Sequence, residues 1–216
     1  MAIFLVSAHW ETAVPSISGN DNSETIYDFA GFSDDIYTLE YPAPSGKVVA
    51  SAIAQKVGFI QDHQRGLDHG AWTPLFAMYP DVDIPVMTLS VSPSKGCEFA
   101  FKLGEQLGCL RKEGVLIIAS GGLVHNLSMI DWANVYAPEA SWASSVMSAI
   151  DAQVKTRVLD TVLKPFEMKY AEKAFTSLEH YLPFLIALGA LEGDEGKLFC
   201  DVWRYRTLSM HSYQFG

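Results

Sequence analysis

Three short apolar runs, separated by stretches with helical spacing, constrain the fold of this chain more than any other feature of its sequence. They are AIFLVS at residues 2–7, IPVMTLSV at 84–91 and VLIIAS at 115–120. Each has the length of a buried strand, and residues 115–120 are apolar on both faces, as strands of a parallel sheet are. Strands that alternate with helices predict an α/β fold, in which a mostly parallel central sheet is flanked by helices.

Apolar residues at helical spacing mark where those helices are expected. The expected segments are 46–59, the later part of 66–80, 94–114, 141–163 and 179–191. Ser45 and Ser177 are candidate N-caps, and Gly114 is placed to close its helix. The aromatic stretch 21–46, broken by glycine and proline, is expected to form a structured loop or lid over a pocket. Residues 207–216 alternate like a final edge strand.

Composition and charge indicate a folded chain and exclude several partners. With 216 residues, 49% of them hydrophobic, the chain can bury the core of one domain spanning residues 1–216. A formal net charge of −10 without a basic cluster argues against nucleic acid. Neither a signal-peptide pattern nor a bilayer-spanning apolar run is present, so no membrane partner is expected. Cys97, Cys109 and Cys200 lack CxxC spacing and are expected to be reduced, buried thiols, which favours a cytoplasmic location.

Two of the six histidines follow strands of the predicted sheet. His9 comes just after residues 2–7, and His125 comes shortly after residues 115–120. Ligand sites of open α/β sheets form in the crevice outside the carboxyl ends of the strands. We therefore expect these two imidazoles on the same rim of the sheet.

Two further histidines lie in a glycine-flanked loop and at the start of an expected helix, respectively. His69 stands in GLDHGAW, where glycines allow close approach of the backbone, and His180 starts the segment EHYLPFLIALGAL. The dipole at a helix N-terminus disfavours a charged ring, and a metal requires the neutral one. A lone loop histidine is nevertheless more often a surface or hydrogen-bonding residue, the interpretation kept for His63 and His211. Because no HExxH or HxxxH spacing links the six, spacing alone is weak evidence for a metal.

Other signals are weaker. The glycines of SGG at 120–122 lack phosphate-loop spacing and are better explained as positioning the loop that carries His125. The SxSxG pattern at 16–19 has no strand–turn–helix context and is not a nucleophile elbow. Aromatic residues are core by default, although four of them could wall an aromatic pocket: Trp10, Tyr27, Phe29 and Phe32.

Longer blocks of sequence resemble a known family. They are SAHWET, IYDFAGF, YPAPSG, LDHGAWTPLFAMYPDVDIPV, SGGLVHNL, EHYLPFLIALGA and the terminal SYQFG. In this order, and over nearly the whole chain, they resemble the DOPA-dioxygenase type of extradiol ring-cleaving dioxygenase, within the class III or LigB-like aromatic ring-opening enzymes.

The resemblance implies an enzyme that opens a catechol ring with O₂ and a non-haem Fe(II) ion, with Zn(II) as an alternative metal in the isolated protein. It implies that His9 and His180 bind the metal. It also implies that His125 acts as acid/base or as an additional ligand, and that His69 either supports the metal ligands from outside or binds the substrate. The implied partners are a small aromatic diol and O₂.

The chain departs from the family pattern at one place. The resemblance implies an earlier strand that ends in an HGSP-like turn whose histidine is a further ligand, and no HG[SDA]P occurs in this sequence. A truncated or misassigned gene product and a naturally shortened protein both explain the difference. Either would leave a sheet edge exposed, which a second copy in a homodimer would cover.

Three functions are therefore weighed. The first is extradiol cleavage of a DOPA-like catechol. The second is a binding protein of the same fold, metal-depleted or zinc-bound, that no longer activates oxygen. The third is a zinc-dependent hydrolase, since two or three histidines can activate water.

Overall fold

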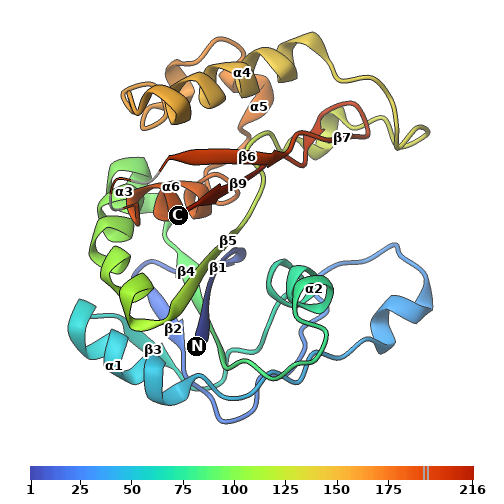
Figure 1. Cartoon of the computed structure of the whole chain (residues 1–216). Helices are drawn as coiled ribbons and strands as arrows, with labels where there is room; N and C mark the ends of the chain where they lie inside the picture. The colour runs from blue at the N-terminus through green and yellow to red at the C-terminus, as the bar shows by residue number, and fades with distance from the viewer. Residues whose placement is uncertain (192, 194) are drawn as a thin grey trace.

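A five-stranded sheet forms the centre of the computed structural model, which describes residues 1–191, 193 and 195–216 (Figure 1). Its strands are β1 (Ala2–Glu11), β2 (Ser16–Ser18), β3 (Ile60–Asp62), β4 (Val86–Val91) and β5 (Val115–Ser120). They lie in the order β3-β2-β4-β1-β5, and only the β2–β4 pair is antiparallel. The predicted α/β fold with a mostly parallel sheet is therefore confirmed.

The central strand β1 separates two hydrophobic cores, because successive side chains of a strand point to opposite faces. Phe4 and Val6 belong to the larger core, which includes α6 and α3, whereas Ile3 and Leu5 belong to a smaller core around α2. All four of these side chains are fully buried. Figure 1 shows α2 on one side of the sheet, with α3 and α6 on the other.

The helices connect and cover the strands. The α-helices are α1 (Lys47–Val57), α2 (His69–Met78), α3 (Gly96–Leu107), α4 (Ser141–Thr156), α5 (Ala171–Ala174) and α6 (Leu182–Gly189). Short 3-10 helices are η1 (Asp34–Thr38), η2 (Pro93–Lys95), η3 (Gly108–Glu113), η4 (Leu127–Met129) and η5 (Pro165–Glu167). Among the described residues, no helix has both the length and the apolar character needed to cross a membrane.

The C-terminal segment forms two small antiparallel sheets beside the central one. The strand β6 (Gly196–Cys200) pairs with β9 (Ser212–Phe215), and β7 (Trp203–Arg204) pairs with β8 (Leu208–Ser209). In Figure 1 the β6–β9 ribbon lies between α6 and α4. Residues 207–216 were predicted as one edge strand, and the structure divides them into two short strands outside the central sheet.

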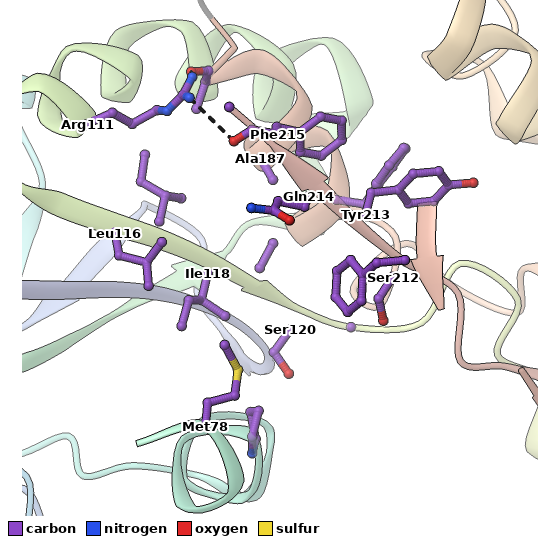
Figure 2. A pocket seen from close by; sticks show the side chains of 18 of the residues that line it. Met78, Arg111, Leu116, Ile118, Ser120, Ala187, Ser212, Tyr213, Gln214 and Phe215 are labelled. Carbon is purple, nitrogen blue, oxygen red and sulfur yellow. Dashed lines mark hydrogen bonds between the residues drawn. The ribbon is translucent and has the colours of Figure 1, made fainter. Parts of the chain in front are cut away.

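The outer edge of β5 borders a large cavity. Its volume is about 1100 Å³, and its lining includes the whole of β5 and of β9 together with part of α6. Figure 2 shows Leu116, Ile118 and Ser120 of β5 facing Gln214 and Phe215 of β9 across this space, with Met78 of α2 below. Although its sequence is apolar on both faces, β5 lies at the edge of the sheet, and Leu116 is 37% exposed.

Several local predictions are confirmed and others are wrong. Gly114 ends its helical segment in the left-handed conformation, as predicted. The helix predicted over 141–163 ends at Thr156, because Arg157 adopts φ 59° and the Gln153 side chain accepts the backbone N–H groups of residues 161 and 162. The three-residue strands β2 and β3 had no sequence signal.

The candidate caps and the cysteines also differ in part from expectation. Ser45 Oγ accepts the N–H of Lys47 at 3.2 Å, but Ser177 does not cap α6 and instead donates to Glu179. The cysteines are free thiols, as expected, but only Cys97 is buried.

Candidate active site

Four histidines from distant parts of the chain converge at the carboxyl end of the sheet. His9 lies near the end of β1, His69 is the first residue of α2, and His125 lies in the loop after β5. The fourth, His180, precedes α6 by two residues. The centroid of the His9 ring lies 3.9 Å from that of the His69 ring and 4.9 Å from that of the His180 ring. His125 and His180 stack at 3.6 Å with an interplanar angle of 11°.

A buried ion pair fixes the end of β1 against the start of α2. Asp68 is 1% exposed and accepts from Ser7 Oγ at 2.6 Å and from Arg65 Nη2 at 2.7 Å. It also caps α2 by accepting the N–H of Ala71 at 3.2 Å. Arg65 Nη2 further donates to the backbone carbonyl of His9 at 3.3 Å, and Ser7 Oγ accepts the N–H of His9 at 3.2 Å. Both polar backbone groups of His9 are therefore held by this network.

Gly70 allows the helix α2 to approach β1 closely. A Cβ at this position would lie 2.8 Å from His9 Cδ2 and 2.8 Å from Ser7 Oγ. Only a residue without a side chain lets the two histidine-bearing segments lie this near each other.

A carboxylate from the aromatic loop contacts two of the histidines. Asp28 Oδ1 accepts from both the backbone N–H and the ring Nδ1 of His69, each at 2.9 Å. Its Oδ2 lies 3.9 Å from His9 Nδ1. Burial of Asp28 opposes its ionisation, but the hydrogen bonds from His69 outweigh this effect and hold the pKa of Asp28 below its ordinary value.

Aromatic side chains of the same loop pack together beside His69. The Phe29 ring lies 5.4 Å from the His69 ring and stacks on Tyr37 at 5.2 Å. Tyr27 and Phe32 contact Phe29, so these three residues form one aromatic cluster, while their role as the wall of a pocket stays a prediction. Trp10 differs, since it is 6% exposed and lies under the guanidinium of Arg65.

The glycine loop after β5 holds the other pair of histidines. Gly122 donates its N–H to the His180 carbonyl at 3.0 Å, and a Cβ on Gly121 would overlap the same carbonyl oxygen. His125 donates its backbone N–H to Ala174 at 3.3 Å. These contacts agree with the prediction that the glycines position the loop rather than bind phosphate.

Burial disfavours the charged form of three of the clustered imidazoles, those of His9, His125 and His180. It lowers the pKa of His180 to about 3, with smaller contributions from the neighbouring rings of His125, His9 and His69. Burial is also the main reason that the pKa values of His9 and His125 are lowered. The helix dipole offered for His180 from sequence is therefore not its main determinant. Neutral rings are the form that binds a metal.

The donor set fits a divalent metal ion. His180 Nδ1 is buried without a hydrogen-bond partner, although buried polar atoms normally have one. His9, Asp28 and His69 offer ligand atoms that lie within 4.8 Å of one another. Imidazole nitrogens with one carboxylate suit first-row metals such as iron and zinc.

The structure thus brings together His9, His69, His125 and His180, while the individual roles predicted for them stay predictions. His63 bonds to the Gly19 carbonyl, and His211 contacts Ser209 and Trp203. Sequence reasoning missed three contributors. Asp68 carried a signal, because an aspartate just before an apolar helix is a typical N-cap, whereas Asp28 and Arg65 are positioned only by tertiary contacts.

Comparison with known proteins identifies related sequences and a related structure. The sequence profile for the catalytic LigB subunit of aromatic ring-opening dioxygenase matches residues 1–216. The chain is 36% identical to the 4,5-DOPA dioxygenase extradiol of Escherichia coli K12 over 229 residues, covering 100% of this chain and 82% of that protein. It is 37% identical to the protein of the same name from Beta vulgaris over 227 residues, covering 99% and 82%. The crystal structure of an uncharacterised Escherichia coli K12 protein superposes with a TM-score of 0.85 at 31% identity, covering 100% of this chain and 86% of that one.

Proposed function

The chain belongs to the LigB family of aromatic ring-opening dioxygenases, and from that premise we propose that it cleaves the ring of a DOPA-like catechol with O₂ and Fe(II). Its relatives identify it as an extradiol ring-opening dioxygenase. The observation that carries the proposal is the convergence of four imidazoles, one of them with a buried nitrogen that lacks a partner.

We assign the metal to His9 and His180, with His125 as third ligand or as acid/base. A bound Fe(II) supplies Lewis acidity toward the diol hydroxyls and the redox chemistry that O₂ requires. The rings reach the site from β1, from the segment before α6 and from the loop after β5, which explains why no local metal-binding spacing exists. Zn(II) binds the same kind of donors and is the expected substitute in protein isolated without iron.

The remaining residues handle the substrate and its protons. His125 is fixed through its backbone bond to Ala174 and through its stacking on His180, so its imidazole can take a proton from a diol hydroxyl and return it later. His69 orients the diol, and the neighbouring Phe29 ring supplies a flat apolar surface for the aromatic ring of the substrate.

The test is an oxygen-uptake assay on protein loaded anaerobically with Fe(II). We expect DOPA or a simpler catechol to consume O₂ and to form a yellow ring-opened product. His9→Ala and His180→Ala are expected to abolish uptake, while His63→Ala, a histidine outside the cluster, keeps the wild-type rate. Catechol binding without oxygen uptake for every diol would instead indicate a non-catalytic binding protein.

We also propose that a second copy of the chain covers the free edge of β5 in a homodimer. The edge carries Leu116 without a charged or proline residue to protect it, which is the pattern that invites pairing with another strand. Light scattering coupled to size exclusion would report the mass of a dimer. A monomer at every concentration would contradict the proposal.

A further inference from the structure

We propose that Asp28 is a positioning residue that holds His69 in a single tautomer, with the proton on Nδ1 and a free lone pair on Nε2. Only the catalytic consequence of this inference depends on the proposed function. The tautomer itself follows from hydrogen-bond chemistry within the chain. The mechanism above does not use Asp28.

The hydrogen bonds determine which nitrogen carries the proton. An ionised carboxylate has no proton to donate and can only accept. Asp28 Oδ1 lies 2.9 Å from His69 Nδ1, so the proton of this bond resides on Nδ1. In the neutral form of the ring, which carries one proton, Nε2 is then the unprotonated nitrogen, able to accept a hydrogen bond from a diol hydroxyl.

A second bond to the same oxygen fixes the ring in place. Asp28 Oδ1 also accepts the backbone N–H of His69 at 2.9 Å. This N–H is one of the donors at the start of α2 that have no partner inside the helix. Because one carboxylate oxygen holds both the backbone and the ring of the same residue, His69 loses its freedom to rotate away or to turn its ring over.

The loop that carries Asp28 is itself held on both sides of this residue. The Trp72 indole donates to the Ile26 carbonyl at 3.1 Å, and the Tyr27 hydroxyl donates to the Leu39 carbonyl at 2.7 Å. On the other side, the Phe29 ring stacks on Tyr37. Asp28 is therefore presented to His69 by a fixed segment, although 26% of its side chain is exposed.

Two plainer roles for Asp28 make different predictions. A helix-capping role requires only the bond to the backbone N–H and would leave the His69 tautomer unaffected. A metal-ligand role would use Oδ2, which lies 3.9 Å from His9 Nδ1, and would make metal binding depend directly on Asp28. The experiment therefore has to read the tautomer and the metal stoichiometry separately.

The experiment compares wild type with Asp28→Asn and Asp28→Ala. Nitrogen-15 NMR of the imidazoles in the metal-free chain reports the His69 tautomer, and titration with Zn(II) reports stoichiometry and affinity. We expect wild type and Asp28→Asn, whose amide oxygen can accept the same bonds, to show the proton on Nδ1. In Asp28→Ala we expect a mixture of tautomers, one Zn(II) per chain still bound, and kcat/KM of the Fe(II) enzyme lowered about 10- to 100-fold.

Three results decide the matter. An unchanged His69 spectrum in Asp28→Ala would overturn the positioning role, and loss of stoichiometric Zn(II) binding in both variants would overturn it in favour of a direct ligand. Asp28→Asn keeps the shape of the side chain and serves as the folding control. If the wild-type protein shows no ring cleavage at all, the proposed function fails, while the NMR comparison still decides the role of Asp28.

Discussion

Replacing Gly70 with alanine tests whether the close approach of α2 to β1 sets the position of His9. The new methyl group would lie 2.8 Å from His9 Cδ2 and 2.8 Å from Ser7 Oγ. The imidazole would have to retreat by about 0.7 Å to reach the 3.5 Å at which two carbon atoms attract each other. Alanine is otherwise favoured over glycine in a helix by up to about 1 kcal/mol, so any loss of stability must come from the clash.

The expected cost follows from these opposing terms. Overpacking of a tight interior site costs about 1–3 kcal/mol, so we expect a net destabilisation of about 1–2 kcal/mol after the helix-propensity gain. A ligand displaced by most of an ångström should weaken Zn(II) binding about 10- to 100-fold. Urea unfolding of the metal-free chain and Zn(II) titration measure the two effects.

A double-mutant cycle with His9→Ala separates the clash from other effects of the methyl group. Removing the His9 ring should reduce the loss in free energy of unfolding that Gly70→Ala causes, with a coupling energy of about 0.5–3 kcal/mol. If Gly70→Ala unfolds at the wild-type urea concentration and binds Zn(II) with wild-type affinity, the argument that this glycine positions His9 is refuted.

Three further predictions concern stability. The pKa of His180 is about 3 in the folded chain and near 6.5 in the unfolded chain, so the unfolded state takes up the proton first as pH falls. The free energy of unfolding of the metal-free protein should therefore fall by about 1.4 kcal/mol per pH unit from this residue between about pH 6 and pH 4. Urea unfolding at stepped pH should show a weaker dependence of this free energy on pH in His180→Asn, and an equal dependence in both proteins would contradict the assignment. Asp68→Asn keeps the helix cap but leaves the Arg65 charge unpaired, so the free energy of unfolding should fall by about 3 kcal/mol. A decrease below about 1 kcal/mol would mean that the ion pair is not effectively buried. In Gly189→Ala the new methyl group would overlap the Phe101 carbonyl oxygen where α6 packs on α3. We therefore expect the free energy of unfolding in urea to fall by about 3 kcal/mol. Wild-type stability of this variant would show that the two helices can move apart at little cost.

The elements predicted correctly are those with a local cause. Residues 2–7 form the central strand because every side chain there is apolar, and Gly114 ends its segment because glycine adopts the left-handed conformation without strain. The strands β2 and β3 were missed because three residues carry no period. The position of β5 at the edge could not be predicted, because an apolar run does not reveal which neighbours a strand will have.

The candidate site divides in the same way. His9 and His125 could be placed on one rim because both follow strands of a parallel sheet. The addition of His180 depended on the resemblance to a family rather than on spacing. Asp28 and Arg65 could not be found, since each contacts a histidine more than 40 residues away in the sequence, and such contacts leave no trace in local composition.

The two hydrophobic cores on opposite faces of β1 have a consequence for how the protein responds to binding. His69 enters the site from the layer of α2, while His125 and His180 enter from the layer of α6, and His9 stands on the strand between them. An ion or substrate bound by residues of both layers would link the α2 layer to the α6 layer. Occupancy should then make the two layers melt as one unit, so that thermal unfolding of the loaded protein sharpens as well as shifts.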